Sequence, residues 1–156
     1  MTGPPPVLIL SVVQAAANET VETLREALLS RPEVLEAYLF GSVARGEVQP
    51  HSDVDVAVFL DPEAVDASGI GFDAAIGAEL MVALRTDRVD VVILNGAPPL
   101  LYHRVLRDGV RLFARDLRAA TVREGRALSR YCDYVPQLAK IRAAREARVA
   151  RGELGR

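Results

Sequence analysis

The sequence predicts an α/β protein in which a small mixed or antiparallel sheet is flanked by helices. Two observations support this expectation. Short apolar runs of strand length alternate along the chain with longer segments in which apolar residues recur at helical spacing. The chain has 156 residues, half of them hydrophobic, so it can bury the core of one domain.

The first part of the chain is predicted to form one helix and two strands. Asn18 has a side chain suited to an N-cap, and apolar residues recur at helical spacing over 19–30. The runs 34–40 and 53–60 have the length and apolar content of strands. A turn-like stretch over 46–52 separates them, and we expect the two strands to pair antiparallel.

The second part of the domain is predicted to alternate helices with strands. A mostly helical stretch over 72–85 precedes an apolar run over 89–94 that is typical of a strand. Proline suits the first turn of a helix and glycine its end, so residues 98–108 should be helical and Gly109 should end that helix. The run 110–114 is expected to form one more short strand.

The chain is expected to divide into a domain over 1–114 and a helical C-terminal extension over 115–156. Within the extension, 116–134 and 137–150 have helical composition, and Pro136 should kink or split the helix. Packing on the domain, binding of a partner and a role as an RNA-binding arm are all open for it. Its approximate apolar stripe consists of Leu117, Thr121, Leu128, Tyr131, Val135, Leu138 and Ile141.

Charge is distributed unevenly between these two parts. Residues 1–114 contain 8 basic and 16 acidic side chains, whereas residues 115–156 contain 11 basic and 5 acidic ones. The acidic body agrees with a metal site and argues against broad nucleic-acid binding. The basic extension leaves room for an acidic partner or RNA.

The remaining composition indicates a soluble cytoplasmic protein without a membrane segment. The single cysteine, Cys132, excludes an internal disulfide. No basic stretch precedes the apolar run over 7–13, as it would in a secretory signal, and no run reaches membrane-spanning length.

The segment from Gly41 to Asp55 is the part of the chain that indicates a chemistry. Ten residues separate Gly41-Ser42 from Asp53-Val54-Asp55. Side chains alternate along a strand, so Asp53 and Asp55 point to the same side and can share metal ions. Carboxylate oxygens suit Mg²⁺, a hard cation that also binds substrate phosphates. An Asp-x-Asp triplet alone is also common in solvated turns and strand edges.

The Gly-Ser pair supplies groups that can bind an anion. Gly41 lacks a Cβ and lets a phosphate approach the backbone, while Ser42 offers a hydroxyl at the start of a short predicted helix. Arg45 lies three residues beyond Ser42 and can reach a phosphate oxygen, although a surface salt bridge with Glu47 is an equal alternative.

Asp90 is predicted to lie on the same face of its strand as Val92 and Leu94, where apolar residues should pack. Burial of a carboxylate is costly unless it is compensated, and a metal shared with Asp53 and Asp55 would compensate it. The alternative is an aspartate at the start of a strand that reaches solvent or pairs with Arg88.

These residues resemble a known group of enzymes. The pattern Gly-Ser-x10-Asp-x-Asp with a later acidic strand residue is similar to that of the polymerase-beta nucleotidyltransferase superfamily. The spelling Gly-Ser-Val-Ala-Arg-Gly, the Pro-Pro-Leu-Leu-Tyr stretch after Asp90 and the compact length resemble its minimal nucleotidyltransferase (MNT) branch, which supplies antitoxins to HEPN-type toxins. The resemblance covers residues 35–113 and implies the polymerase-beta-like nucleotidyltransferase fold.

The resemblance implies roles for the residues of the motif. Asp53, Asp55 and Asp90 would ligate Mg²⁺, with two ions expected, and Asp90 could also act as general base. Phosphates of the substrate ATP would bind at Gly41 and Ser42. Supporting roles in nucleotide binding are expected for Arg45 and Ser52.

The resemblance also implies an acceptor. MNT antitoxins attach AMP from ATP to a tyrosine of the cognate HEPN ribonuclease and so silence it. The extra domain with which larger nucleotidyltransferases grip base and acceptor is not expected in this chain, which favours a protein acceptor over a small one. Two alternatives remain open: transfer of AMP to a small molecule such as an aminoglycoside, and a non-catalytic module that neutralises a toxin by covering it.

Overall fold

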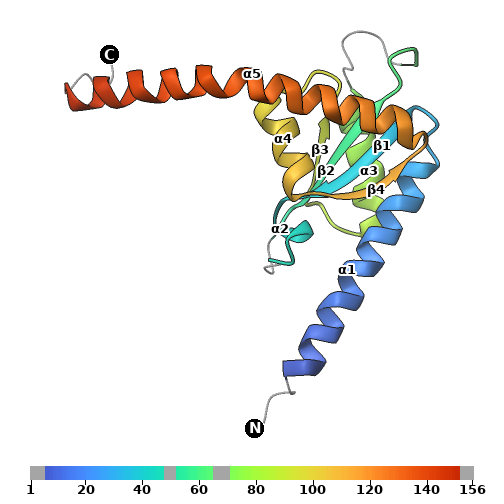
Figure 1. The fold of residues 1–156 in the computed structure, drawn as a ribbon. Coiled ribbons are helices and arrows are strands. Elements are labelled where there is room, and N and C mark those ends of the chain that lie inside the picture. Colours follow the sequence, from blue (N-terminus) through green and yellow to red (C-terminus); the bar gives the residue numbers. More distant parts are fainter. Residues whose placement is uncertain (1–5, 48–51, 65–70, 152–156) are drawn as a thin grey trace.

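A four-stranded sheet with helices on both faces forms the body of the molecule (Figure 1). The computed structural model describes residues 6–47, 52–64 and 71–151. The predicted α/β class is confirmed. In chain order the elements are α1 (Pro6–Leu29), β1 (Val34–Phe40), α2 (Gly41–Ala44), β2 (Val54–Leu60), α3 (Phe72–Leu84), β3 (Val89–Ile93), α4 (Pro99–Asp108), β4 (Val110–Ala114) and α5 (Leu117–Ala150).

The sheet is mixed, with strand order β3-β2-β1-β4. β1 runs antiparallel to both β2 and β4, as expected for the first two strands, whereas β2 and β3 are parallel. Asp55 pairs in register with Phe40 on one side and with Asp90 on the other. The end of β1 and the beginnings of β2 and β3 therefore meet at one end of the sheet.

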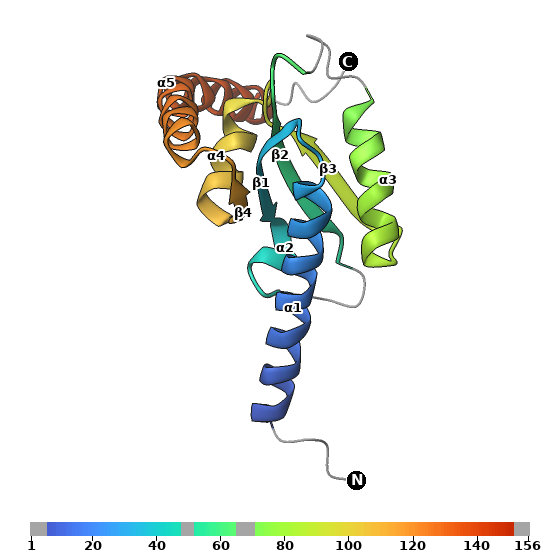
Figure 2. The same cartoon turned by 90° about the vertical axis from the view of Figure 1, so that its right-hand side faces the viewer.

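Side-chain alternation along the strands produces two apolar layers. On β2, Val56 and Val58 belong to the core beneath α1 and α3, while Ala57 belongs to the core beneath α4 and α5. Figure 2 shows the sheet between α3 on one side and α4 with α5 on the other. Leu24 and Leu28 anchor α1 in the first layer and are fully buried.

The first helix begins much earlier than the sequence suggested. It starts at Pro6 and continues through Asn18, so the prediction that Asn18 caps it is wrong. Proline is favoured at the first helical position. Residues 15–17 are alanines, and alanine has the highest helix propensity of the amino acids. The N-terminal part of α1 extends away from the sheet (Figure 1).

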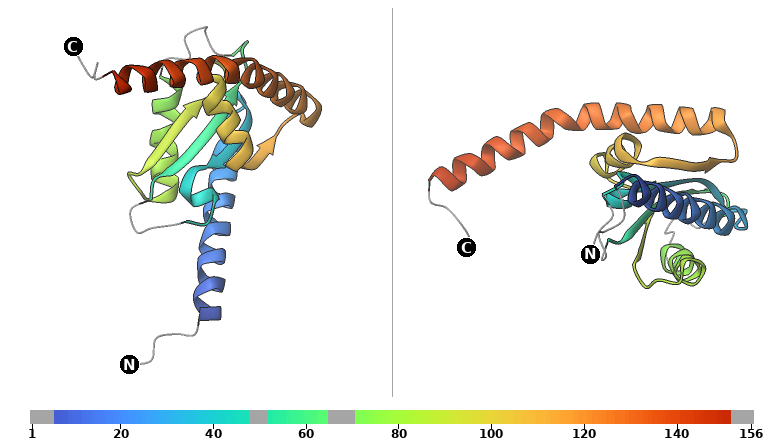
Figure 3. Two further views of the ribbon diagram at one scale, coloured as in Figure 1. Left: turned by 60° about the vertical axis from the view of Figure 1, so that its left-hand side comes forward. Right: turned by 90° about the horizontal axis from the view of Figure 1, so that it is seen from below.

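The last helix is continuous through Pro136 and is not split. Asp116 caps its first turn, where Oδ1 accepts hydrogen bonds from the backbone N–H groups of Arg118 and Ala119 at 2.9 and 3.0 Å. The first part of α5 lies over α4, and the rest continues beyond the sheet (Figures 1 and 3).

The predicted apolar stripe of α5 is largely wrong. Leu117 is 61% exposed and Ile141 58% exposed, and Thr121, Leu128 and Val135 are exposed as well. The buried positions are instead Ala120 and Ala127. Small side chains let the helix approach closely, and beyond the sheet nothing in the described chain covers α5.

A polar cluster lies under the first half of α5. Glu36 on β1 is fully buried, and Arg123 of α5 donates a hydrogen bond to it. The Tyr38 hydroxyl lies 2.8 Å from carboxylate oxygens of both Glu36 and Glu124, and Arg111 of β4 pairs with Glu124. Each buried charge therefore has an opposite charge beside it, as burial requires.

Over residues 6–47, 52–64 and 71–151, no helix combines the length and apolar character of a membrane-spanning segment.

Candidate active site

The backbone of Gly41 lies directly against the side chain of Asp55. Gly41 has a positive φ of 75°, and a Cβ built on it would stand 1.9 Å from Oδ2 of Asp55. The register of β1 and β2 places Asp55 opposite Phe40, directly before this glycine. Only glycine leaves room for the carboxylate at this turn, so the Gly-Ser turn and the Asp-x-Asp strand form one site.

The Asp55 carboxyl lies within the electrostatic influence of Asp53 and Asp90. Asp55 and Asp90 are register partners on parallel strands and therefore share a face of the sheet. Partial burial raises the pKa of Asp55 above its ordinary value, and the negative charges of Asp90 and then Asp53 raise this pKa further. The structure thus places Asp55 beside Asp90 in the sheet, and the charges of both Asp90 and Asp53 act on the Asp55 carboxyl.

Asp90 is exposed, and the expectation that it would be buried is wrong. β3 lies at the edge of the sheet, and Asp90 is the second residue of that strand. The open position agrees with the alternative that this aspartate reaches solvent. It also leaves the carboxylate accessible to a second molecule.

Arg45 pairs with Glu47, its Nε donating to Oε2 at 3.0 Å. This is the surface salt bridge that the sequence offered as an alternative to a phosphate contact. The Arg45 charge nonetheless lowers the pKa of Asp55, against the larger opposing effects of burial and the other aspartates. Arg45 therefore lies close enough to the carboxylates to act on a group bound there.

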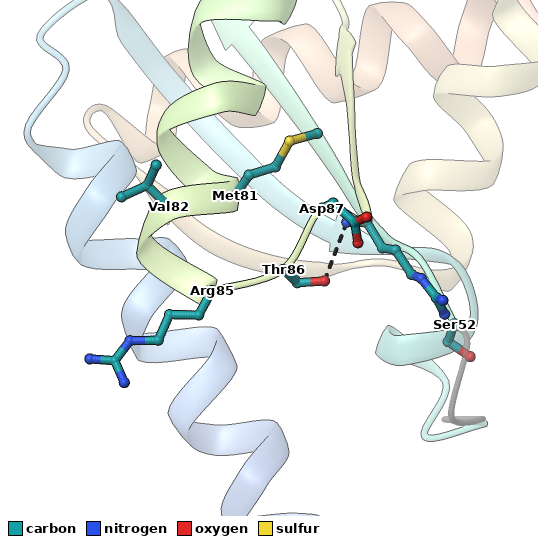
Figure 4. Close-up of a pocket in the computed structure, with 7 residues that line it drawn as sticks. Ser52, Met81, Val82, Arg85, Thr86 and Asp87 are labelled. Carbon is teal, nitrogen blue, oxygen red and sulfur yellow. Dashed lines mark hydrogen bonds between the residues drawn. The ribbon is translucent and has the colours of Figure 1, made fainter.

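Ser52 lines a cavity of about 680 Å³ between the start of β2 and the connection from α3 to β3 (Figure 4). The backbone N–H of Val54 donates to the carbonyl of Arg88 at 2.9 Å and joins these two segments. The other lining residues are Met81, Val82, Arg85, Thr86, Asp87 and Arg88. This cavity was not predictable from the sequence, because its lining comes from the end of a helix and a connection that carry no motif.

The fit of a metal ion depends on the chemistry of these donors. Within the described residues, no three His, Cys, Asp or Glu side chains are already arranged to hold an ion. Asp53, Asp55 and Asp90 nevertheless supply the oxygen ligands that Mg²⁺ prefers. Burial and then the charges of Asp90 and Asp53 raise the pKa of Asp55, and a bound cation would offset these neighbouring charges, so the donor set fits Mg²⁺.

The mixed sheet and the Asp55 carboxylate packed against the Gly-Ser turn are those of a nucleotidyltransferase. The family model described as "Polymerase beta, Nucleotidyltransferase" matches residues 22–118, more than half of the chain. The protein belongs to this family.

Solved structures with this fold include toxin-antitoxin assemblies. The crystal structure of a toxin-antitoxin with AMP-PNP contains a chain that is 26% identical, with a TM-score of 0.62 and coverage of 82% of this chain and 97% of that one. A structure of tri-AMPylated Shewanella oneidensis HEPN toxin in complex with MNT antitoxin matches at 24% identity and a TM-score of 0.57, covering 85% and 98%; this likeness establishes the fold alone. No curated protein sequence matches the chain significantly.

Proposed function

We propose that this protein is a Mg²⁺-dependent antitoxin that transfers AMP from ATP to a tyrosine of a cognate HEPN ribonuclease toxin and thereby neutralises it. The observation that carries the proposal is the packing of the Asp55 carboxylate against Gly41, which joins the two halves of the nucleotidyltransferase motif. The family membership and the 26% identical chain from a toxin-antitoxin structure with AMP-PNP support it.

In the proposed AMP transfer, each residue of the site has a distinct role. Asp53, Asp55 and Asp90 would hold Mg²⁺ ions, which would neutralise phosphate charge and lower the pKa of the attacking hydroxyl. Gly41 and Ser42 bind the phosphates of ATP. The tyrosine oxygen forms a bond to the α-phosphorus, the bond from that phosphorus to pyrophosphate breaks, and the phenol proton passes to Asp90.

Arg45 and Ser52 have supporting roles in this proposal. Arg45 exchanges Glu47 for a phosphate oxygen, a change that costs little because an exposed ion pair contributes only about 0.2–1 kcal/mol. Ser52 directly precedes Asp53 and borders the adjacent cavity, where its hydroxyl can contact bound nucleotide.

The accessibility of the site favours a protein as the acceptor. Asp53 and Asp90 are exposed at the open end of the sheet, so a tyrosine on the surface of another protein can reach them. An acceptor of this size requires no enclosed pocket, in contrast to a small molecule, which must be surrounded to be bound.

Intact-mass spectrometry of a candidate HEPN partner tests the proposal. The partner is incubated with this protein, ATP and Mg²⁺, beside the variant Asp53→Ala/Asp55→Ala and the control Glu19→Ala/Glu26→Ala, which removes two exposed acids from α1. Whole AMP units should be added by the wild type and the control only. A partner that is inhibited but never modified would indicate a covering module, and AMP transfer to an aminoglycoside without any partner would indicate a drug-modifying enzyme.

A further inference from the structure

A second cavity, of about 490 Å³, lies between β2, α4 and the first half of α5. Three of its lining residues are arginines of α5 whose spacing of three and four places them on one face of the helix. The lining consists of Phe59, Tyr102, Arg123, Arg126, Ser129 and Arg130. Three guanidinium groups therefore border the cavity, those of Arg126 and Arg130 on exposed side chains, in a region that the candidate active site does not use.

This cavity is separate from the carboxylates of the candidate active site. Phe59 lies on the same face of β2 as Asp55 but four residues further along, which corresponds to about 13 Å of strand. Ala57, which lies between them, is fully buried in the core beneath α4 and α5. A ligand in this cavity would thus not contact the metal-binding acids.

Two of the arginines carry uncompensated charge. Arg123 pairs with the buried Glu36, and its guanidinium lies 4.7 Å from the centre of the Phe59 ring. Among the residues that the structure describes, neither Arg126 nor Arg130 has an ion-pair partner. Two positive charges therefore remain available at the cavity.

The hydroxyl of Tyr102 is the second feature that indicates a ligand. Tyr102 is 2% exposed, and its buried hydroxyl has no hydrogen-bond partner within the described structure. Burial is the main reason that the pKa of Tyr102 is raised to about 12, so the group keeps its proton near neutral pH. A buried hydroxyl without a partner costs free energy, and an acceptor oxygen from a ligand would remove that cost.

We propose that this cavity binds a phosphate group. The Arg126 and Arg130 guanidinium groups match the two charges of a phosphate monoester or of inorganic phosphate, and arginine binds phosphate oxygens in a bidentate manner. The Tyr102 hydroxyl donates to a further phosphate oxygen. The cavity has the volume of an ordinary small-molecule site, so it can admit free phosphate or a mononucleotide. The proposal does not rest on the transfer reaction.

Calorimetric titration with inorganic phosphate and with AMP tests this site. The full-length protein carries Asp53→Asn/Asp55→Asn, and EDTA is present, so that nucleotide cannot bind through metal at the candidate active site. Addition of Arg126→Gln/Arg130→Gln should weaken phosphate binding at least tenfold. The matched control Arg142→Gln/Arg145→Gln removes two exposed arginines from the same helix beyond the cavity, and it should leave the affinity unchanged.

The substitution Tyr102→Phe separates a ligand role from a structural one. Loss of the unpartnered hydroxyl should raise the melting temperature of the free protein, yet weaken phosphate binding about tenfold, as loss of one hydrogen bond to a charged group does. Tighter binding of AMP than of phosphate would identify a phosphate ester as the ligand, and equal affinities would identify the phosphate group alone. The proposal would be overturned if phosphate binding were not saturable, or if Arg126→Gln/Arg130→Gln and Arg142→Gln/Arg145→Gln lowered the phosphate affinity equally. Unchanged phosphate affinity in Tyr102→Phe would also overturn it.

Discussion

At Gly41 the backbone has a positive φ, and the Asp55 carboxylate fills the space that a side chain would occupy. Gly46 provides a matched comparison, because its φ of 72° is nearly the same and a Cβ there would meet nothing within 4 Å. Substitution of Gly46 therefore introduces backbone strain alone, whereas substitution of Gly41 introduces the same strain and a steric clash with Asp55.

We expect Gly46→Ala to lower the free energy of unfolding by about 1 kcal/mol through backbone strain alone. Gly41→Ala should lower it by about 3 kcal/mol, because a clash is added, and should reduce AMP transfer at least about 100-fold as Asp55 is displaced. Urea unfolding and the mass-spectrometric transfer assay measure these effects. Equal losses of transfer in both variants would contradict the role given to the contact.

The raised pKa of Asp55 makes a prediction about pH. A carboxyl whose folded-state pKa lies above its unfolded value of 3.8 binds more protons in the folded state, so it lowers stability as the pH rises through the interval between these two values. In EDTA, Asp55→Asn should therefore be more stable than the wild type at neutral pH, and the difference should disappear below pH 3.8. Urea titrations across pH test this, and a less stable Asp55→Asn at pH 7 would refute it.

Residue types and their spacing predicted candidate side chains for the site but not all of the surroundings of those side chains. The spacing of Asp53 and Asp55 and the acid on a later strand predicted a shared metal site; in the structure β2 begins at Val54, after Asp53, and its register with β3 places Asp55 beside Asp90. The exposure of Asp90 was not predictable, because it depends on the position of β3 at the edge of the sheet. The order of strands in a sheet cannot be predicted from short stretches of sequence. The partner of the buried Glu36 comes from a helix 87 residues away, which no local pattern indicates.

At the scale of elements, α5 shows where periodicity misleads. Its apolar residues predicted a packing stripe, yet alanines form the buried face and the larger apolar residues remain exposed. The apolar periodicity of the sequence indicates which residues of α5 could pack. Which of them are buried depends on how α5 lies against its neighbours, such as α4. The strands were predicted more reliably, because each is bounded by turn-forming residues and has neighbours on both faces.

The N-cap of α5 allows a test of how firmly this element is held. Asp116→Ala removes two hydrogen bonds to the first turn and should lower the free energy of unfolding by about 1 kcal/mol. Asp116→Asn keeps an acceptor oxygen and should lose much less. Chemical denaturation of both variants measures the difference, and equal stability of Asp116→Ala and wild type would mean that the cap contributes nothing.

For the whole molecule, the main division is between the packed body and the part of α5 beyond it. Residues 139–151 are all exposed (Figure 3). Truncation after Leu138 should therefore leave the free energy of unfolding of the body within about 0.5 kcal/mol of the wild type, as expected where no buried contact is lost. Denaturant unfolding tests this expectation, and a large loss of stability would show that the far end of α5 supports the fold.

Because β2 and β3 pair in parallel, the length of the connection from α3 to β3 sets the register between these two strands. Asp90 pairs in register with Asp55 because the connection over residues 85–88 has the length that this register requires. A one-residue insertion within 85–88 that shifted β3 by one position would turn Asp90 toward the face beneath α1 and α3 and put an apolar neighbour beside Asp55. Insertions should consequently be tolerated far less at this short bend than single substitutions, although the bend itself contributes no carboxylate to the proposed metal site.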